Sequence, residues 1–300
     1  MNNLLRAFLF SLIVPCTLGA QSANKADSLI AELNYATNDS VKAVLCRKIF
    51  SEFILSNMDS AEIFAKQELE LARKIASKRL EGDANEDMAR IAWQRNDLAT
   101  ALNFLQSTLE IREKDKDKKG IANCENNIGI IYWNLKNSEE ALEHYKRAMI
   151  MRVELNDSSG IASSYGNIGL VYREMGKLDS ADAYYRKCMM LREKLGNPMY
   201  LTIAYNNMAA MFLAYEKADS AIAYLEKSAP LYRQTNDMYG YAGCLNNLGT
   251  AYRMQGRFDE AKTAQLEGVQ VSIAQDNKDV LKNCYGELST IAATQGQYKE

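Results

Sequence analysis

The sequence predicts an all-α fold, a solenoid of stacked antiparallel helix pairs, and two observations support this prediction. Shifted by forty residues, the chain places alanine on alanine at six successive positions: Ala61, Ala101, Ala141, Ala181, Ala221 and Ala261. Within a repeat, apolar residues recur at spacings of three and four, as Ile161, Tyr165, Ile168 and Tyr172 do. This spacing forms one apolar helix face, which a single helix pair can bury only against neighbouring pairs.

The first twenty residues resemble a secretory signal peptide. Arg6 ends a short positive region, the apolar segment AFLFSLIV (7–14) follows, and small residues precede Gln21. The segment is too short to span a bilayer, so we expect cleavage after Ala20, with Gly19 as the alternative, and export of residues 21–300 to the periplasm or another extracytoplasmic space. Lipid attachment at Cys16 is the disfavoured alternative, because Pro15 fits a lipoprotein signal poorly. No other stretch is apolar enough to cross a membrane.

Residues 21–40 are predicted to form an N-terminal capping helix, because ADSLIAELNYATND (26–39) has amphipathic spacing. The repeat array is predicted over residues 41–300. Its repeats lie near 41–78, 79–117, 118–157, 158–197, 198–237 and 238–277, with a partial repeat at 278–300. Since the partial repeat reaches only its first helix, we expect the sequence to be part of a longer protein.

Each break between two helices has a chemical marker. In MGKLDSA (175–181) and QGRFDEA (255–261), Gly ends the first helix and Asp, Ser or Glu begins the second. Pro230 stands late in the second helix of repeat five and is expected to kink or end that helix.

Small and aromatic residues also recur every forty residues in the first helices. The small position holds Gly129, Gly169, Ala209 and Gly249, and the aromatic position holds Tyr132, Tyr172, Phe212 and Tyr252. Glycine inside a helix costs about 1 kcal/mol relative to alanine, so it must permit close packing. We expect these glycines to face Ala141, Ala181 and Ala261 of the second helices. A phosphate-binding loop would need clustered glycines between a strand and a helix, which the sequence lacks.

The segment NIGLVYREMGKLDSADAYYRKCM (167–189) resembles a tetratricopeptide repeat. The forty-residue period is similar to the longer variant in kinesin light chains and in the asymmetric-division scaffold that binds receptor-coupled G proteins. The match is strong in repeats three, four and six, fair in repeat five, and weak in repeats one and two, which lack Gly-x-x-Tyr. The resemblance implies a right-handed superhelix whose first helices line a concave inner surface.

The residues give no support to catalysis, a cofactor or a metal site. His144 is the only histidine, and we expect it to face solvent on its helix. The five cysteines that follow the signal segment form no CxxC pair and are expected to be small buried residues. A net charge of −2 with both signs interspersed gives no basic patch for nucleic acid. We therefore predict a protein that is not an enzyme.

An asparagine stands two residues before the small position in four successive first helices. These asparagines, here called the asparagine ladder, are Asn127, Asn167, Asn207 and Asn247. In the family that the repeats resemble, peptide-binding members carry asparagine at this position to hold the ligand backbone. An amide can both donate to and accept from a peptide unit. The alternative is that these amides only bond to adjacent helices and support the stack.

Residues around the ladder limit the expected ligand. Asn123, Ser163, Ile203 and Gly243 precede it by four, and Ile130, Leu170, Ala210 and Thr250 follow it by three. We expect a neutral, partly apolar groove, with Arg173 and Arg253 at its edge and without the basic clamp that holds a C-terminal carboxylate. The leading hypothesis is an exported scaffold for a protein or extended peptide. The alternative is the sensory arm of a larger histidine kinase or DNA-binding regulator, as in some Bacteroidetes-like bacteria.

Overall fold

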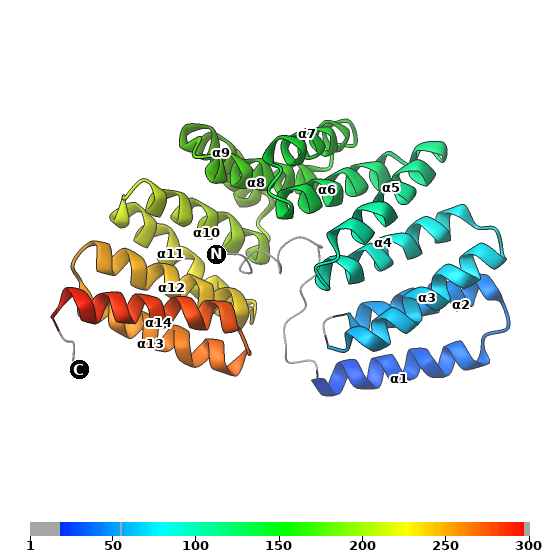
Figure 1. Cartoon of the computed structure of the whole chain (residues 1–300), viewed down its shortest axis with the longest axis horizontal. Coiled ribbons are helices and arrows are strands. Elements are labelled where there is room, and N and C mark those ends of the chain that lie inside the picture. Colours follow the sequence, from blue (N-terminus) through cyan, green and yellow to red (C-terminus); the bar gives the residue numbers. More distant parts are fainter. Residues whose placement is uncertain (1–18, 55, 297–300) are drawn as a thin grey trace. The chain divides into compact units, whose positions relative to one another are not determined.

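The structure is a computed structural model that describes residues 19–54 and 56–296, and these residues form α-helices and no strand. This confirms the predicted all-α fold. Figure 1 shows the helices joined by short turns. In chain order they are α1 (Gly19–Tyr35), α2 (Asp39–Phe53), α3 (Met58–Lys74), α4 (Lys78–Gln94), α5 (Leu98–Lys114), α6 (Lys118–Asn134), α7 (Ser138–Glu154), α8 (Ser158–Glu174), α9 (Leu178–Leu195), α10 (Pro198–Ala214), α11 (Ala218–Gln234), α12 (Met238–Met254), α13 (Phe258–Ala274) and α14 (Lys278–Thr294).

The chain divides into two compact units. Among the described residues, the N-terminal unit contains α1 to α7 and the C-terminal unit contains α8 to α14. In each unit the first helix of a repeat packs on the second, as α4 does on α5 and α10 does on α11. First helices of successive repeats also touch: α2 contacts α4, and α8, α10, α12 and α14 contact one another in sequence.

The two ends of the described chain are the helices α1 and α14. The predicted signal segment lies outside the described residues, apart from Gly19 and Ala20, which begin α1. Helix α1 packs on α2. Near the other end, α14 packs on α13 and α12 of the preceding repeat. The export of the chain stays a prediction.

From α3 onward, every helix is followed by a residue with positive φ. From Ala76 to Gly296, each twentieth residue has a positive φ, and only four of these residues are glycine. After most of these helices the next residue donates its N–H to a carbonyl five positions earlier, as Lys177 does to Tyr172 at 2.9 Å, whereas α9 ends with a bond from Gly196 N to Arg192 O at 3.0 Å. This left-handed cap satisfies the last carbonyl groups of the helix and reverses the chain. Its spacing of twenty residues is half of the sequence repeat.

The helix starts are less uniform. Asn, Asp or Ser caps most first turns with its side chain, as Asp97 does by accepting from Thr100 N at 3.1 Å. The second helices of repeats four, five and six are preceded instead by Lys177, Lys217 and Arg257, which make no such bond. In these helices an aspartate in the first turn supplies the negative charge that a helix N-terminus favours.

The repeated alanines and glycines form the contact between paired helices. All six alanines at the forty-residue spacing are 0% exposed. A Cβ added at Gly129 would lie 2.8 Å from the Tyr145 ring, and one at Gly169 would lie 2.8 Å from Tyr185 Cδ1. The expectation that these glycines face alanine is therefore wrong in its main partner: they make room for a buried tyrosine four residues after the alanine. Gly249 makes room for Gln265 instead.

The aromatic residues of the first helices stack on the second helices. Ring centroids are 5.6 Å apart in both Tyr172–Tyr184 and Phe212–Tyr224. In repeat three, Tyr132 stacks on His144 at 5.2 Å, and His144 Nδ1 lies 2.5 Å from Glu125 Oε2. The expectation that His144 faces solvent is wrong, since its side chain is only 13% exposed. Its position faces the first helix of its own pair, as Tyr184 and Tyr224 do.

The structure also tests the predictions made for Pro230 and for the cysteines. Helix α11 continues past Pro230 to Gln234, so the proline does not end it. Proline removes one backbone donor near the end of the helix, and the remaining turn still has its packing partners. The five described cysteines are buried and free, as expected for small core residues. Burial raises the pKa of Cys46 to about 12 and that of Cys244 to about 11, which keeps both thiols protonated.

Candidate binding face of the first helices

The asparagine ladder lies on four first helices in two units. Asn167, Asn207 and Asn247 lie on α8, α10 and α12 of the C-terminal unit, and Asn127 lies on α6 of the N-terminal unit. All four are half-buried. Because α8, α10 and α12 contact one another in sequence, the three asparagines of the C-terminal unit lie on adjacent helices. We call the surface that carries these three residues the ladder face.

The amides of the ladder face are not equally engaged. Asn247 Nδ2 donates to Asn206 Oδ1 at 3.1 Å and so links α12 to α10. Asn167 also has an interaction within the protein. The side chain of Asn207 makes no hydrogen bond within the described part of the chain, and its Nδ2 is 4.0 Å from where a Cβ on Gly166 would lie. Asn207 therefore keeps its donor and acceptor groups available beside a glycine of α8, the first helix of the preceding repeat.

The structure corrects the expected lining of the groove beside the asparagine ladder. Ile130 and Leu170 are buried, at 0% and 5% exposed, so they belong to the core. Ser163 accepts a hydrogen bond of 2.6 Å from Arg192. Ala210 and Thr250 remain half-buried. The asparagines directly before the ladder, Asn206 and Asn246, escaped sequence reasoning although the Asn-Asn doublet is visible in both repeats.

The two arginines proposed for the groove edge have different surroundings. Arg253 Nε lies 2.7 Å from Glu287 Oε2 on α14, so an internal carboxylate already binds it. Arg173 is half-buried beside Tyr185. Burial raises the pKa of Tyr185 to about 12, and the charge of Arg173 partly opposes this rise. One paired and one half-buried arginine do not make a clamp for a ligand carboxylate.

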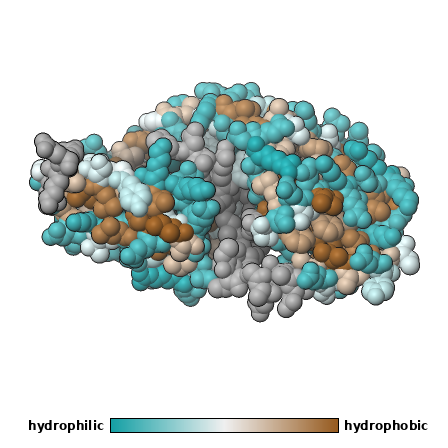
Figure 2. Space-filling view, turned by 60° about the horizontal axis from the view of Figure 1, so that its bottom comes forward, coloured by the Kyte–Doolittle hydropathy of each residue, from teal (hydrophilic) through white to brown (hydrophobic). Residues whose placement is uncertain are grey.

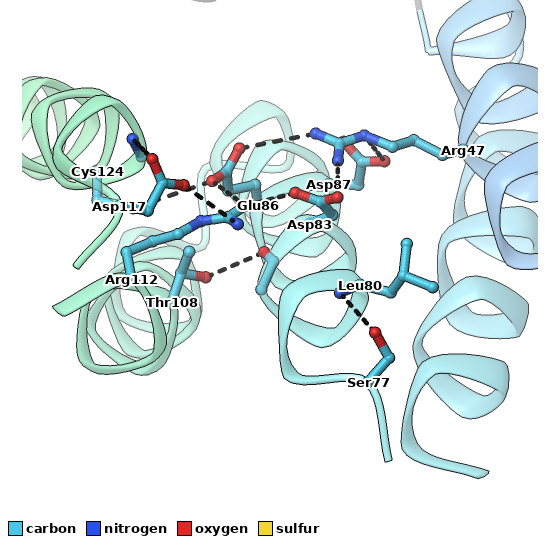
Figure 3. Close-up of polar contacts among 12 residues, drawn as sticks. Arg47, Ser77, Leu80, Asp83, Glu86, Asp87, Thr108, Arg112, Asp117 and Cys124 are labelled. Carbon is cyan, nitrogen blue, oxygen red and sulfur yellow. Dashed lines mark hydrogen bonds and ion pairs between the residues drawn. The ribbon is translucent and has the colours of Figure 1, made fainter. Parts of the chain in front are cut away.

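A charged cluster occupies the corresponding positions in the N-terminal unit. Asp87 on α4 precedes Asn127 by forty residues and stands at the ladder position of repeat two. Figure 3 shows Asp83, Glu86 and Asp87 between Arg47 of α2 and Arg112 of α5. Arg47 NH1 lies 2.7 Å from Asp83 Oδ2, and Arg112 NH2 lies 3.2 Å from Glu86 Oε1 and also contacts Asp83. Helices α2 and α4 therefore carry paired charges where α6 and the ladder face carry amides.

Buried arginines form a second ladder that sequence reasoning missed. Arg112, Arg152 and Arg192 follow one another at forty residues and are 5–7% exposed. Each reaches the first helix of its own repeat: Arg112 binds Asp83 and Glu86, Arg152 binds Asn126 at 3.3 Å, and Arg192 binds Ser159 and Ser163. Their strict spacing was a readable signal in the sequence, although charged residues are rarely fully buried.

The described residues contain no group of three or more His, Cys, Asp or Glu side chains arranged to hold a metal ion. None of the described helices is long and apolar enough to span a bilayer. In Figure 2, apolar residues form separate patches among hydrophilic ones on the visible face.

With stacked helix pairs and an amide-bearing face on the first helices, the molecule is an α-helical repeat protein. The family model described as Tetratricopeptide repeat matches residues 120–194 and 200–274, half of the chain. The chain belongs to the tetratricopeptide repeat family. No curated protein matches it in sequence.

Several solved structures are similar in fold. The apo form of the quorum sensor NprR from B. thuringiensis is 15% identical and has a TM-score of 0.66, over 91% of this chain and 76% of that one. A Rap protein complexed with competence and sporulation factor is 15% identical with a TM-score of 0.64, over 92% and 81%. The Pyrococcus horikoshii signal transduction ATPase PH0952, which has a tetratricopeptide repeat sensor, is 15% identical with a TM-score of 0.66, over 92% and 45%. At this identity the likeness shows the fold alone.

Proposed function

We propose that the chain is a non-enzymatic scaffold and that its ladder face binds a protein segment or peptide in extended conformation. The observation that carries this proposal is the half-buried Asn207 amide, which has no partner in the described chain and lies between the helices that carry Asn167 and Asn247. Its donor and acceptor groups are therefore available to bond to a ligand backbone in place of water.

The spacing of the ladder face suits an extended chain. Packed helices are roughly 10 Å apart, and an extended peptide advances about 3.3 Å per residue. One asparagine on each first helix therefore meets about every third peptide unit of a ligand that crosses the helices. Because the contact is made to the ligand backbone, this arrangement sets affinity with little dependence on the ligand sequence.

The solved relatives support the partner class. The Rap protein was solved with competence and sporulation factor, and NprR is a quorum sensor. Both share this fold over more than nine tenths of the present chain. A binding role is consistent with these two structures. The kind of ligand that this chain binds has to be inferred from its own ladder face.

The test begins with peptides selected from a random display library on the purified chain. Their affinity is then compared between the wild type and the double variant Asn167→Ala/Asn207→Ala. We expect a loss of tenfold or more, which corresponds to roughly one or two hydrogen bonds. Gln270→Ala is the matched control, because it removes an exposed amide on α13. Equal affinity of the folded double variant and the wild type would contradict the proposal.

We further propose that the scaffold is exported by its N-terminal segment. Arg6 and the apolar residues 7–14 motivate this proposal. Expression in a Gram-negative bacterium should give periplasmic protein whose first residue is Gln21, as measured by mass spectrometry. An unprocessed Met1 in the cytoplasmic fraction would refute it.

A second candidate function is a sensory arm of a larger signalling protein. PH0952 supports this alternative, because in that protein a tetratricopeptide repeat sensor is joined to a signal transduction ATPase and the present chain covers 45% of its length. The reading frame after Glu300 tests it. An apolar span followed by a kinase or a DNA-binding domain would support the sensory role, and an immediate stop codon would contradict it.

A further inference from the structure

We propose that Glu68 is protonated in the native protein and shares its proton with Asp87, so that the packing of repeat one on repeat two depends on pH. The two residues lie on α3 and α4, which pack directly on each other in the N-terminal unit. The proposal is independent of any ligand on the ladder face.

The burial of Glu68 is the first observation that supports a protonated carboxyl group. Its side chain is 0% exposed, and neither carboxyl oxygen has a hydrogen-bond partner. Asp87 is 8% exposed, and its Oδ2 also has no hydrogen-bond partner. The two carboxyl groups adjoin each other. Two carboxylates are both acceptors, whereas one added proton creates a donor and permits one hydrogen bond between the two groups.

The charged groups around Glu68 and Asp87 are the second observation that supports a shared proton. Cys46 and Arg47 approach from α2, and Asp83, Glu86 and Arg90 lie beside Asp87 on α4. Arg112 of α5 binds Asp83 and Glu86. Asp117 also lies 3.6 Å from Arg112, but its side chain is 40% exposed to solvent. The other four carboxyl groups face three guanidinium groups, and one retained proton balances these seven groups. An uncompensated buried charge strongly destabilises the folded state.

Electrostatics agree with this geometry. Burial raises the pKa of Glu68, the negative charge of Asp87 raises it further, and Arg47 opposes the rise. Burial also raises the pKa of Asp87. Because the folded protein holds the proton more tightly than the unfolded chain, this stabilisation is complete below the unfolded pKa. It is lost as pH rises through the folded pKa.

The test is urea unfolding of the full chain at pH 6 to 8, where ordinary carboxyl groups are ionised and ordinary thiols are not. Trp93, on α4, reports unfolding by fluorescence in a Trp133→Phe background. Glu68→Gln mimics the protonated acid, because an amide donates N–H. Glu70→Gln, exposed on the same helix, is the matched control.

In the wild type and in Glu70→Gln, the unfolding equilibrium constant should rise about tenfold per pH unit relative to Glu68→Gln. The same pH dependence in all three proteins would overturn the proposal. If Glu68→Gln fails to fold, infrared spectra of the wild type decide. A protonated-carboxyl band at pH 7 that moves on ¹³C labelling of glutamate supports the shared proton, and its absence refutes it.

Discussion

At Gly169, two effects on stability oppose each other. Alanine would favour the helix by about 1 kcal/mol, but its Cβ would lie 2.8 Å from the ring of the buried Tyr185. Tyr185 is 1% exposed and cannot move away without opening the contact between α8 and α9. Close packing therefore outweighs helix propensity at this residue, and a steric requirement explains the glycine without any ligand.

We expect Gly169→Ala to destabilise the protein by roughly 1–3 kcal/mol and Gly169→Leu by more, because both overpack the tyrosine. Gly176→Ala is an instructive comparison: no atom lies within 4 Å of its Cβ, but φ is +72°. It should cost about 1 kcal/mol through backbone strain alone. Urea unfolding followed by circular dichroism measures both, with Lys177→Ala as a near-neutral control. Equal effects from Gly169→Leu and Lys177→Ala would contradict the packing role.

The sequence predicted the positions of the repeated residues better than it predicted which side chains they contact. The forty-residue spacing located Gly169, Ala181 and Tyr172 correctly in paired helices, because stacking requires the same residue at the same place in each repeat. It did not identify Tyr185 as the partner of Gly169. The helix-pair geometry that decides this contact is set by side chains on both helices and is not contained in a linear spacing.

At the scale of the element, the turns follow a stricter rule than the sequence suggests. Lys136 and Glu216 adopt positive φ although neither residue favours it. The fixed length of the helices and their packing impose this conformation, so composition alone could not predict it. The buried Arg112 and Arg192 were missed for a related reason, since their burial depends on carboxyl or hydroxyl partners in another helix.

The uncapped start of α9 offers a prediction about an element. Lys177 has φ −84° and ψ 66°, close to the φ −87° and ψ 77° of Asp97, which caps α5 through Thr100 N. Lys177→Asp should therefore accept a hydrogen bond from Ser180 N and stabilise the protein by about 1 kcal/mol. Thermal or urea unfolding measures this change. A stability no higher than that of Lys177→Ala would show that the backbone there does not form a cap.

At the scale of the whole molecule, nearest-neighbour stacking predicts local responses. Both tryptophans, Trp93 and Trp133, lie in the N-terminal unit, whereas Ala221 is 0% exposed in repeat five. In a stacked array, stability is a sum of repeat terms and neighbour terms. A perturbation in repeat five should therefore fade before it reaches the tryptophans.

We expect Ala221→Leu to lower the urea midpoint measured by circular dichroism, which reports all helices, more than the midpoint measured by tryptophan fluorescence. Overpacking should cost roughly 1–3 kcal/mol locally. Ala101→Leu, in repeat two, serves as the reciprocal variant and should lower the fluorescence midpoint. Equal shifts in both signals for both variants would indicate one cooperative unit and contradict the nearest-neighbour account.

The fold of the whole chain was predictable because the repeat specifies it many times over. The ladder face was predictable only in part: the spacing identified Asn207, but the bond from Asn247 to Asn206 and the burial of Leu170 required the structure. The ladder asparagines occupy equivalent positions in successive repeats, but the side chains around them differ from repeat to repeat. Equivalent asparagines are therefore not equally available to bind a ligand.

Recognition of a ligand backbone by the ladder face can be tested most directly by nuclear magnetic resonance. The side-chain amide signals of Asn167, Asn207 and Gln270 are assigned by substitution and followed while a selected peptide is added. We predict that the Asn207 signal shifts in step with binding and that its amide exchanges more slowly with solvent, while Gln270 does not change. Saturation of the protein with peptide while the Asn207 signal stays unmoved would contradict the account.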